Sequence, residues 1–281
     1  MSATHPSDAV SPTAFYTGYV WNKHGLSHPA FLTAEGRRLY RLGQPMMRLS
    51  AMLGGPTIEG FLLARHRIID RLLTEAIDSG RVSQVIEIAA GLSPRGWRFT
   101  QRYGDRLTYI EADLPGMAER KRRLLAEAGI AGPRHRVVEL DALATSGPAS
   151  LDAIAGTLDA TRGVAIITEG LLNYLDRQSV IGLWRRMARV LKRFPHGLYL
   201  SDLHVLADNR SLFTATFGAM LGIFVRGRVH VHFRDSARAE AALKDAGFNS
   251  ARLISPAEAG DLLGGPLLPG ARLVRVIDAN V

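Results

Sequence analysis

The chain has 281 residues, of which 47% are hydrophobic, a formal net charge of +9 and no cysteine. This length suffices for one large α/β domain with a full core, and we expect a single domain over residues 1–281. The lack of cysteine excludes disulfides, thiolate catalysis and zinc–thiolate centres. A metal would therefore need histidines and carboxylates, and we assign no metal site.

The positive charge is spread along several predicted helices, for example over residues 120–123 and 185–193, without exposed aromatic residues between the basic ones. We interpret these residues as solvated helix faces and do not expect nucleic acid as a partner, although a basic RNA-binding or RNA-modifying protein stays open. No apolar run approaches the roughly 18 residues of a membrane span, and the first residues lack the order of a signal peptide. We therefore expect a soluble cytoplasmic protein without a membrane partner, and the oligomeric state stays undefined.

The region from residue 10 to 80 has a helical pattern. Ile69, Leu73 and Ile77 recur every fourth residue, and Gly80 lies where a helix C-cap would fall. The sequence Gly-Gly-Pro at 54–56 predicts a break before this helix. We expect the region to form an N-terminal helical lid.

Strand and helix patterns alternate from residue 81, which predicts crossover units and a mostly parallel sheet. We expect five strands at 85–89, 107–112, 134–140, 163–168 and 197–203. A cap insertion is expected at 204–235, then a helix at 236–246 and two strands at 249–254 and 271–277. The last two strands lack a crossover helix and should pair antiparallel. The prediction is a doubly wound α/β fold, with a seven-stranded, mostly parallel sheet and one antiparallel strand.

The stretch Q-V-I-E-I-A-A-G-L-S-P-R-G at 84–96 reads as a buried strand that runs into a turn of small residues. The dinucleotide fingerprint G-x-G-x-x-G is absent, so phosphate binding is poorly supported. The acidic-x-small-x-Gly-x-small pattern of S-adenosylmethionine enzymes fits better, on Glu87, Ala89, Gly91 and Ser93. A second acidic strand end follows in Y-I-E-A-D-L-P at 109–115, which indicates a ligand that carries a nucleoside.

Four separated segments carry a resemblance to a known family. They are G-F-L-L-A-R-H-R-I-I-D (60–70), E-I-A-A-G-L-S-P-R-G-W-R-F (87–99), Y-I-E-A-D-L-P-x-x-x-x-R-K (109–121) and I-T-E-G-L-L-N-Y-L (167–175). On these segments the chain resembles the leucine carboxyl methyltransferase family, which includes the tetracenomycin-type polyketide O-methyltransferases. The resemblance implies a Rossmann-like class I methyltransferase with S-adenosyl-L-methionine as cofactor.

The resemblance also implies roles for residues at the strand ends. Arg65 would grip the cofactor's carboxylate, and Gly91 would lie against the methionine tail. Asp113 would take the ribose hydroxyls, with Glu111 as a substitute on the same strand face. The alternatives are a solvent-facing helix arginine for Arg65 and a helix N-terminal charge for Asp113.

Two further strand ends receive roles in the same way. Asp141, with Ala142 beside it, would contact the adenine edge, and Glu169 would lie near the cofactor's amino group and the methyl-transfer centre. A carboxylate in so apolar a context needs a partner, and the alternative for Glu169 is a salt bridge to an arginine.

The acceptor and the catalytic group are not defined by the sequence. A carboxylate acceptor needs no base, whereas a hydroxyl would benefit from a histidine, and five histidines lie in the predicted lid and cap, at 24, 28, 204, 230 and 232. We expect an apolar acceptor pocket lined by Tyr16, Tyr19, Trp21 and Phe217. The leading hypothesis is an O-methyltransferase for a small or polyketide-like molecule. The alternatives are a protein C-terminal carboxyl methyltransferase, a nucleoside-binding domain without catalysis and the RNA-directed protein named above.

Overall fold

The computed structural model describes residues 12–209 and 230–281. Most of the expected cap insertion, with Phe217, lies outside the described residues, and the lid at 10–80 stays a prediction. The described part forms a seven-stranded sheet in the order β3-β2-β1-β4-β5-β7-β6. The strands are β1 Gln84–Ile88, β2 Thr108–Asp113, β3 His135–Glu139, β4 Val164–Thr168, β5 Gly197–Leu203, β6 Ser250–Ile254 and β7 Arg275–Asn280.

The sheet is parallel except for β7, which runs antiparallel to both of its neighbours, β5 and β6. This confirms the predicted α/β sheet with one reversed strand. Every residue of β1, β4 and β5 is buried, as expected for parallel strands that are covered on both faces. That double burial is the reason why these strands appear in the sequence as short continuous apolar runs.

The predicted strand boundaries agree with the structure to within a residue for β1 to β6. The prediction for the last strand, 271–277, was wrong at both ends, because Ala271–Leu273 forms a 3-10 turn and β7 begins at Arg275. Gly270 before it has a φ of 91°, a left-handed conformation that glycine adopts without strain. The apolar residues that suggested an earlier strand therefore belong to a turn that precedes it.

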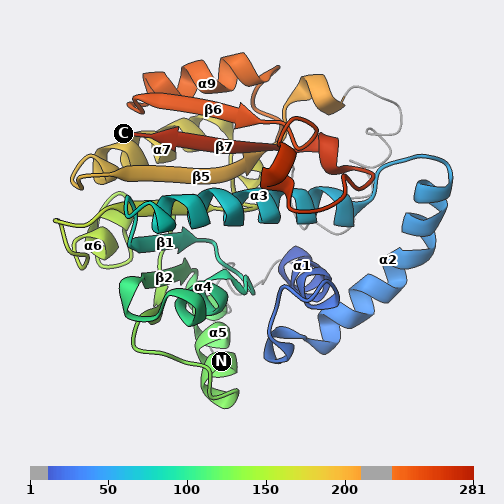
Figure 1. The fold of residues 1–281 in the computed structure, drawn as a ribbon, viewed down its shortest axis with the longest axis horizontal. Helices are drawn as coiled ribbons and strands as arrows, with labels where there is room; N and C mark the ends of the chain where they lie inside the picture. Colours follow the sequence, from blue (N-terminus) through green and yellow to red (C-terminus); the bar gives the residue numbers. More distant parts are fainter. Residues whose placement is uncertain (1–11, 210–229) are drawn as a thin grey trace, which may run out of the picture.

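Helices cover both faces of the sheet (Figure 1). Helix α3 (Ile58–Asp78) lies along one face together with α4 (Arg95–Tyr103), and α5 (Pro115–Glu127) packs beside β2 and β3. Helices α6 (Leu151–Ala155), α7 (Arg177–Leu191) and α9 (Ser236–Asp245) cover the other face, where the fully buried Trp184 lies in the largest core cluster. Helices α4, α5 and α7 follow β1, β2 and β4, so their N-termini lie near the carboxyl ends of these parallel strands, at one edge of the sheet.

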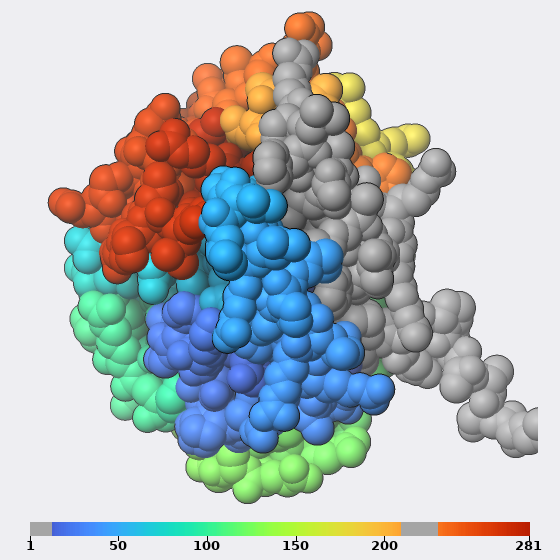
Figure 2. Space-filling model, turned by 90° about the vertical axis from the view of Figure 1, so that its right-hand side faces the viewer, coloured from blue at the N-terminus to red at the C-terminus, as the bar shows by residue number. Residues whose placement is uncertain are grey.

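The two N-terminal helices, α1 (Pro12–Lys23) and α2 (Ala34–Met52), pack on each other at the end of the molecule toward which the parallel strands point. Gly36 allows this contact, because a Cβ there would lie 2.4 Å from the carbonyl oxygen of Phe15. The break at 54–56 separates α2 from α3, as predicted. Figure 2 shows α1 and α2 spread over this end of the molecule. In the described ranges, no helix has the length and apolar character that a bilayer crossing requires.

Candidate active site

A cavity of about 360 Å³ lies at the carboxyl ends of β1, β2, β4 and β5, between the sheet and helices α1 and α3. Its volume falls within the range of small-molecule binding sites. Six of the eight residues that we predicted as cofactor ligands line it, and they are Arg65, Glu87, Ala89, Gly91, Asp113 and Glu169. The expected convergence of strand ends is therefore present for β1, β2 and β4.

The turn after β1 is shaped by two residues with positive φ. Ala89 has a φ of 55° and Gly91 a φ of 51°. The Gly91 N–H donates to Asp113 Oδ2 at 2.7 Å, and the Leu114 N–H donates to Asp113 Oδ1 at 2.8 Å. Burial raises the pKa of Asp113, although these two N–H groups oppose the shift. Each oxygen keeps a second lone pair, so this carboxylate can still accept hydrogen bonds from a ligand.

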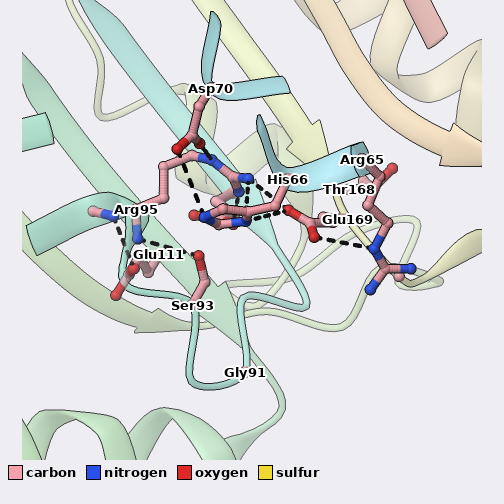
Figure 3. A network of polar contacts seen from close by, with 12 residues as sticks. Arg65, His66, Asp70, Gly91, Ser93, Arg95, Glu111, Thr168 and Glu169 are labelled. Atoms are coloured by element: carbon pink, nitrogen blue, oxygen red, sulfur yellow. Dashed lines mark hydrogen bonds and ion pairs between the residues drawn. The ribbon is translucent and has the colours of Figure 1, made fainter. Parts of the chain in front are cut away.

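A buried guanidinium organises the polar wall of the cavity. Arg95, at the start of α4, is fully buried and forms ion pairs with Asp70 at 2.6 Å, Glu87 at 2.5 Å and Glu169 at 2.5 Å. Figure 3 shows its guanidinium between Asp70 and Glu169. The other oxygen of Glu87 accepts from the Tyr109 hydroxyl at 2.7 Å. Glu87 is therefore held by the protein itself on both oxygens.

Glu169, directly after β4, has three basic neighbours. It accepts hydrogen bonds from Arg65 Nε at 3.1 Å and from Arg95, and His66 Nδ1 lies 3.0 Å from it. Burial by itself would raise the pKa of Glu169, but the nearby His66 and Arg95 lower the pKa well below its ordinary value. The salt bridge that we considered as an alternative is thus present, and a ligand role for Glu169 stays a prediction.

Arg65 is buried, with 7% of its surface exposed, rather than solvent-facing. Its Nη1 donates to Asp202 Oδ2 at 2.8 Å, and Asp202 Oδ1 accepts from the Gly170 N–H at 2.6 Å. Gly170, with a φ of 75°, permits this approach, since a Cβ there would lie 3.0 Å from Arg65 Nη2. No residue in the described ranges accepts a hydrogen bond from that Nη2, so it can still hold a ligand carboxylate.

The network around the cavity contains more negative than positive side chains. Its ion pairs join four carboxylates, Asp70, Glu87, Glu169 and Asp202, to three guanidinium groups, Arg65, Arg95 and Arg98, and to His66. Asp113 adds a fifth carboxylate at the cavity wall. A local excess of carboxylates attracts a positively charged ligand.

Sequence reasoning missed two parts of this network. Asp202 is the last residue but one of β5 and lies at the same sheet edge as Glu169, and that shared edge was the signal that could have identified it. His66 and Asp70 lie one turn apart on α3, on the face that carries Arg65 toward the sheet. They belong to the segment 60–70 that supported the resemblance, but their contacts with Arg95 depend on how α3 and α4 pack.

Glu111, the substitute for Asp113, does not line the cavity. It is fully buried, where it pairs with Lys121 Nζ at 2.8 Å and His135 Nε2 at 2.9 Å. Burial opposes ionisation, but these two basic groups lower the pKa of Glu111 to about 2. A Cβ on Gly96 would lie 2.6 Å from Glu111 Oε1, so this glycine makes room for the pair. Glu111, Lys121 and His135 thus form a closed structural cluster.

Some of the other predicted site residues line the cavity and others do not. Tyr16 and Trp21 line the cavity, whereas Tyr19 stacks on Tyr40 with ring centroids 4.4 Å apart. Asp141 is exposed beyond β3, where it accepts from the Leu143 N–H at 2.8 Å. Neither Asp141 nor Ala142 lines the cavity, so their adenine contacts stay predictions.

One of the five candidate histidines lines the cavity, and it is His204 after β5. His24 pairs with Glu59 at 2.9 Å, and His28 Nδ1 accepts from the Ala30 N–H at 3.2 Å. His230 and His232 stack on each other with ring centroids 6.0 Å apart.

Solved structures of methyltransferases share this fold. A provisionally named methyltransferase from Thermobifida fusca superposes with a TM-score of 0.60 over 98% of this chain and 96% of its own, at 14% identity. A DUF574 family protein from Streptomyces avermitilis superposes with a TM-score of 0.61 over 95% and 96%, also at 14% identity. The fold is therefore that of the Rossmann-like methyltransferases.

Sequence comparison gives the family. The family model described as "Leucine carboxyl methyltransferase" matches residues 29–188, more than half of the chain, and the chain belongs to that family as predicted. A Rhodococcus jostii protein, provisionally named an S-adenosyl-L-methionine-dependent methyltransferase, is 36% identical over 49% of this chain and 45% of its own length. A Mycobacterium marinum protein with the same provisional name is 30% identical over 53% and 54%. The chain spans about half the length of these relatives.

Proposed function

We propose that the protein is an S-adenosyl-L-methionine-dependent O-methyltransferase, which methylates a carboxylate or hydroxyl of a small molecule such as a polyketide or another secondary metabolite. The observation that carries this proposal is the meeting of Arg65, Gly91, Asp113 and Glu169 at one cavity. Membership of the family and the names of the two relatives support methyl transfer.

The residues at the cavity fit the cofactor's functional groups. Arg65 Nη2, which donates to no residue in the described ranges, suits the carboxylate of the methionine tail, and Asp113 has lone pairs for ribose hydroxyls. The turn of Glu87, Ala89 and Gly91 would back the tail. Asp141 and Ala142 do not line the cavity, and their contact with the adenine stays a prediction. Glu169 and the local excess of carboxylates suit the ammonium and sulfonium charges.

The bound cofactor would supply an electrophilic methyl group on a sulfonium. The protein's own contribution is to hold the acceptor beside that group and to exclude water. Tyr16 and Trp21, each more than nine-tenths buried, provide an apolar wall from α1, and Phe61 and Leu62 continue it from α3. Such a wall favours an acceptor with an aromatic or aliphatic body.

The shape and charge of the site favour a small acceptor over the alternatives. Helices α1 and α2 cover the end of the molecule where the cavity lies, which disfavours the insertion of a protein C-terminus (Figure 2). The carboxylates at the wall would repel the phosphates of RNA, which disfavours an RNA substrate in this cavity.

Two measurements on the purified protein test the proposal. Calorimetric titration with S-adenosylmethionine and S-adenosylhomocysteine should show binding of each at one site. Incubation with methyl-labelled donor and a panel of aromatic acids and phenols should transfer label to an acceptor oxygen. Binding without transfer to any acceptor would favour a nucleoside-binding domain, and steep salt-dependent RNA binding without cofactor binding would favour an RNA-directed protein.

A further inference from the structure

His204 lines the cavity directly after β5. The strand order places the ends of β2 and β1 on one side of β4 and the end of β5 on the other. Gly91 and Asp113, our predicted cofactor ligands, lie at the first side, whereas His204 follows β5, two residues after Asp202. Arg65 reaches this wall through its bond to Asp202, so the cofactor's carboxylate would lie there, and His204 is the further polar group that this wall offers to the molecule that receives the methyl group.

The hydrogen bonding of His204 fixes which ring nitrogen carries the proton. His204 Nδ1 lies 2.6 Å from the carbonyl oxygen of Leu273, which can only accept, so Nδ1 is the donor. The neutral ring then has a lone pair on Nε2. No residue within 12–209 or 230–281 forms a hydrogen bond with that Nε2. Phe61 packs its ring against the imidazole edge-to-face, with centroids 5.5 Å apart, and so fixes the plane of the ring.

The groups around His204 favour the uncharged imidazole. Burial has the largest effect on its pKa and lowers it, and the charge of Arg65 from α3 acts in the same direction. Asp202 on β5, Asp208 in the turn Leu206–Asn209 and the Leu273 carbonyl act in the opposite direction. The resulting pKa of His204 lies below the ordinary histidine value, so the ring is neutral at pH 7.

We propose that His204 is the general base of an acceptor subsite at the end of β5, and that the acceptor is a hydroxyl compound such as a phenol or an enol. The acceptor's O–H bond breaks and its proton moves to Nε2. An electron pair of that oxygen forms the bond to the methyl carbon, and the carbon–sulfur pair remains on sulfur, which leaves as a neutral thioether. Nε2 later releases the proton to water. This inference rests on the proposed function.

The test uses His204→Asn, because an asparagine amide can still donate toward the Leu273 carbonyl while it lacks the basic nitrogen. The matched control is His196→Gln, an exposed histidine just before the other end of β5. We expect kcat for a phenol to fall about 100-fold or more in His204→Asn, with cofactor Kd and acceptor KM within about threefold, and no change in the control. A phenol that is already ionised at the assay pH should restore most of the lost rate.

A second readout does not depend on turnover. An NMR titration of the histidine rings in the protein without cofactor should show one ring, absent from the His204→Asn spectrum, with a pKa below the ordinary value. In the native enzyme kcat for a phenol should rise with pH to a plateau, and in His204→Asn it should rise without one.

Failure of this inference can be separated from failure of the proposed function. Three results would contradict the role of His204 as general base. They are an unchanged kcat for phenols in His204→Asn, an equal loss of kcat with ionised and neutral phenols, and a charged His204 ring at pH 7. Transfer to carboxylic acids alone would also overturn that role and leave O-methylation intact. Absence of transfer to any acceptor in the native enzyme would overturn both proposals together.

Discussion

Two buried charge clusters flank helix α4, and they differ in their access to the cavity. The open cluster joins Arg95 and Arg65 to an excess of carboxylates and lines the cavity. The closed cluster of Glu111, Lys121 and His135 is sealed, and none of its residues lines the cavity. A motif residue can therefore serve the scaffold, and access to the cavity distinguishes the cluster that could bind a ligand.

The largest effect should follow from loss of the hub of the open cluster. Arg95→Met would leave Asp70, Glu87 and Glu169 without their shared cation, which should destabilise the fold by about 3–5 kcal/mol. Urea unfolding measures this change. Arg98→Met, which removes a partly exposed arginine from Asp70 and His66, is the graded control. Equal stability of Arg95→Met and the native protein would contradict the role of Arg95.

Loss of the cation in the closed cluster should affect stability but not the ligand. Lys121→Met leaves Glu111 with His135 as its remaining basic partner and should cost about 2–4 kcal/mol of unfolding free energy. Cofactor affinity should stay unchanged in the folded fraction, as measured by calorimetry. Arg123→Met, at an exposed position on the same helix, should change neither quantity. A large loss of affinity in Lys121→Met would remove the distinction between the two clusters.

Arg65→Ala tests whether the open cluster binds the cofactor. It removes the guanidinium that faces the cavity, so cofactor binding should weaken by about 1.5–3 kcal/mol, the scale of a charged hydrogen bond. Arg67→Ala, which lies on the same helix but does not line the cavity, is the control for helix effects. Calorimetric affinities that agree between Arg65→Ala and the native protein would show that Arg65 serves the scaffold alone.

The closed cluster should also determine part of the dependence of stability on pH. The pKa of Glu111 is lowered to about 2 in the folded protein, so the unfolded state takes up its proton first as the pH falls. Its contribution to stability is therefore complete above about pH 4.5 and is lost as the pH falls toward 2. Glu111→Gln should flatten the slope of unfolding free energy against pH in that window. An unaltered slope would contradict the ionised state of Glu111.

The sequence predicted the sheet well because its strands are buried on both faces and are separated by clear helical patterns. The start of β7 was mistaken because a local apolar run resembles a strand, while the left-handed Gly270 determines where the chain turns. Strand ends such as Gly91 and Asp113 could be found because parallel topology brings them to one edge.

The contacts between helices could not be predicted in the same way. The hub role of Arg95 depends on α3 and α4 bringing Asp70 and His66 to it, and side-chain contacts between two helices leave no local pattern in the sequence. Glu111 shows the converse case, because alternation puts it on the same strand face as Asp113, whereas its pairs with Lys121 and His135 keep its side chain out of the cavity.

The most direct test of the central claim is a crystal structure of the protein with S-adenosylhomocysteine. We predict that the ligand lies in the cavity, with its carboxylate on Arg65 Nη2, its tail along Gly91 and its ribose hydroxyls on Asp113. A ligand bound elsewhere, or a ligand in the cavity that contacts neither Arg65 nor Asp113, would contradict the account.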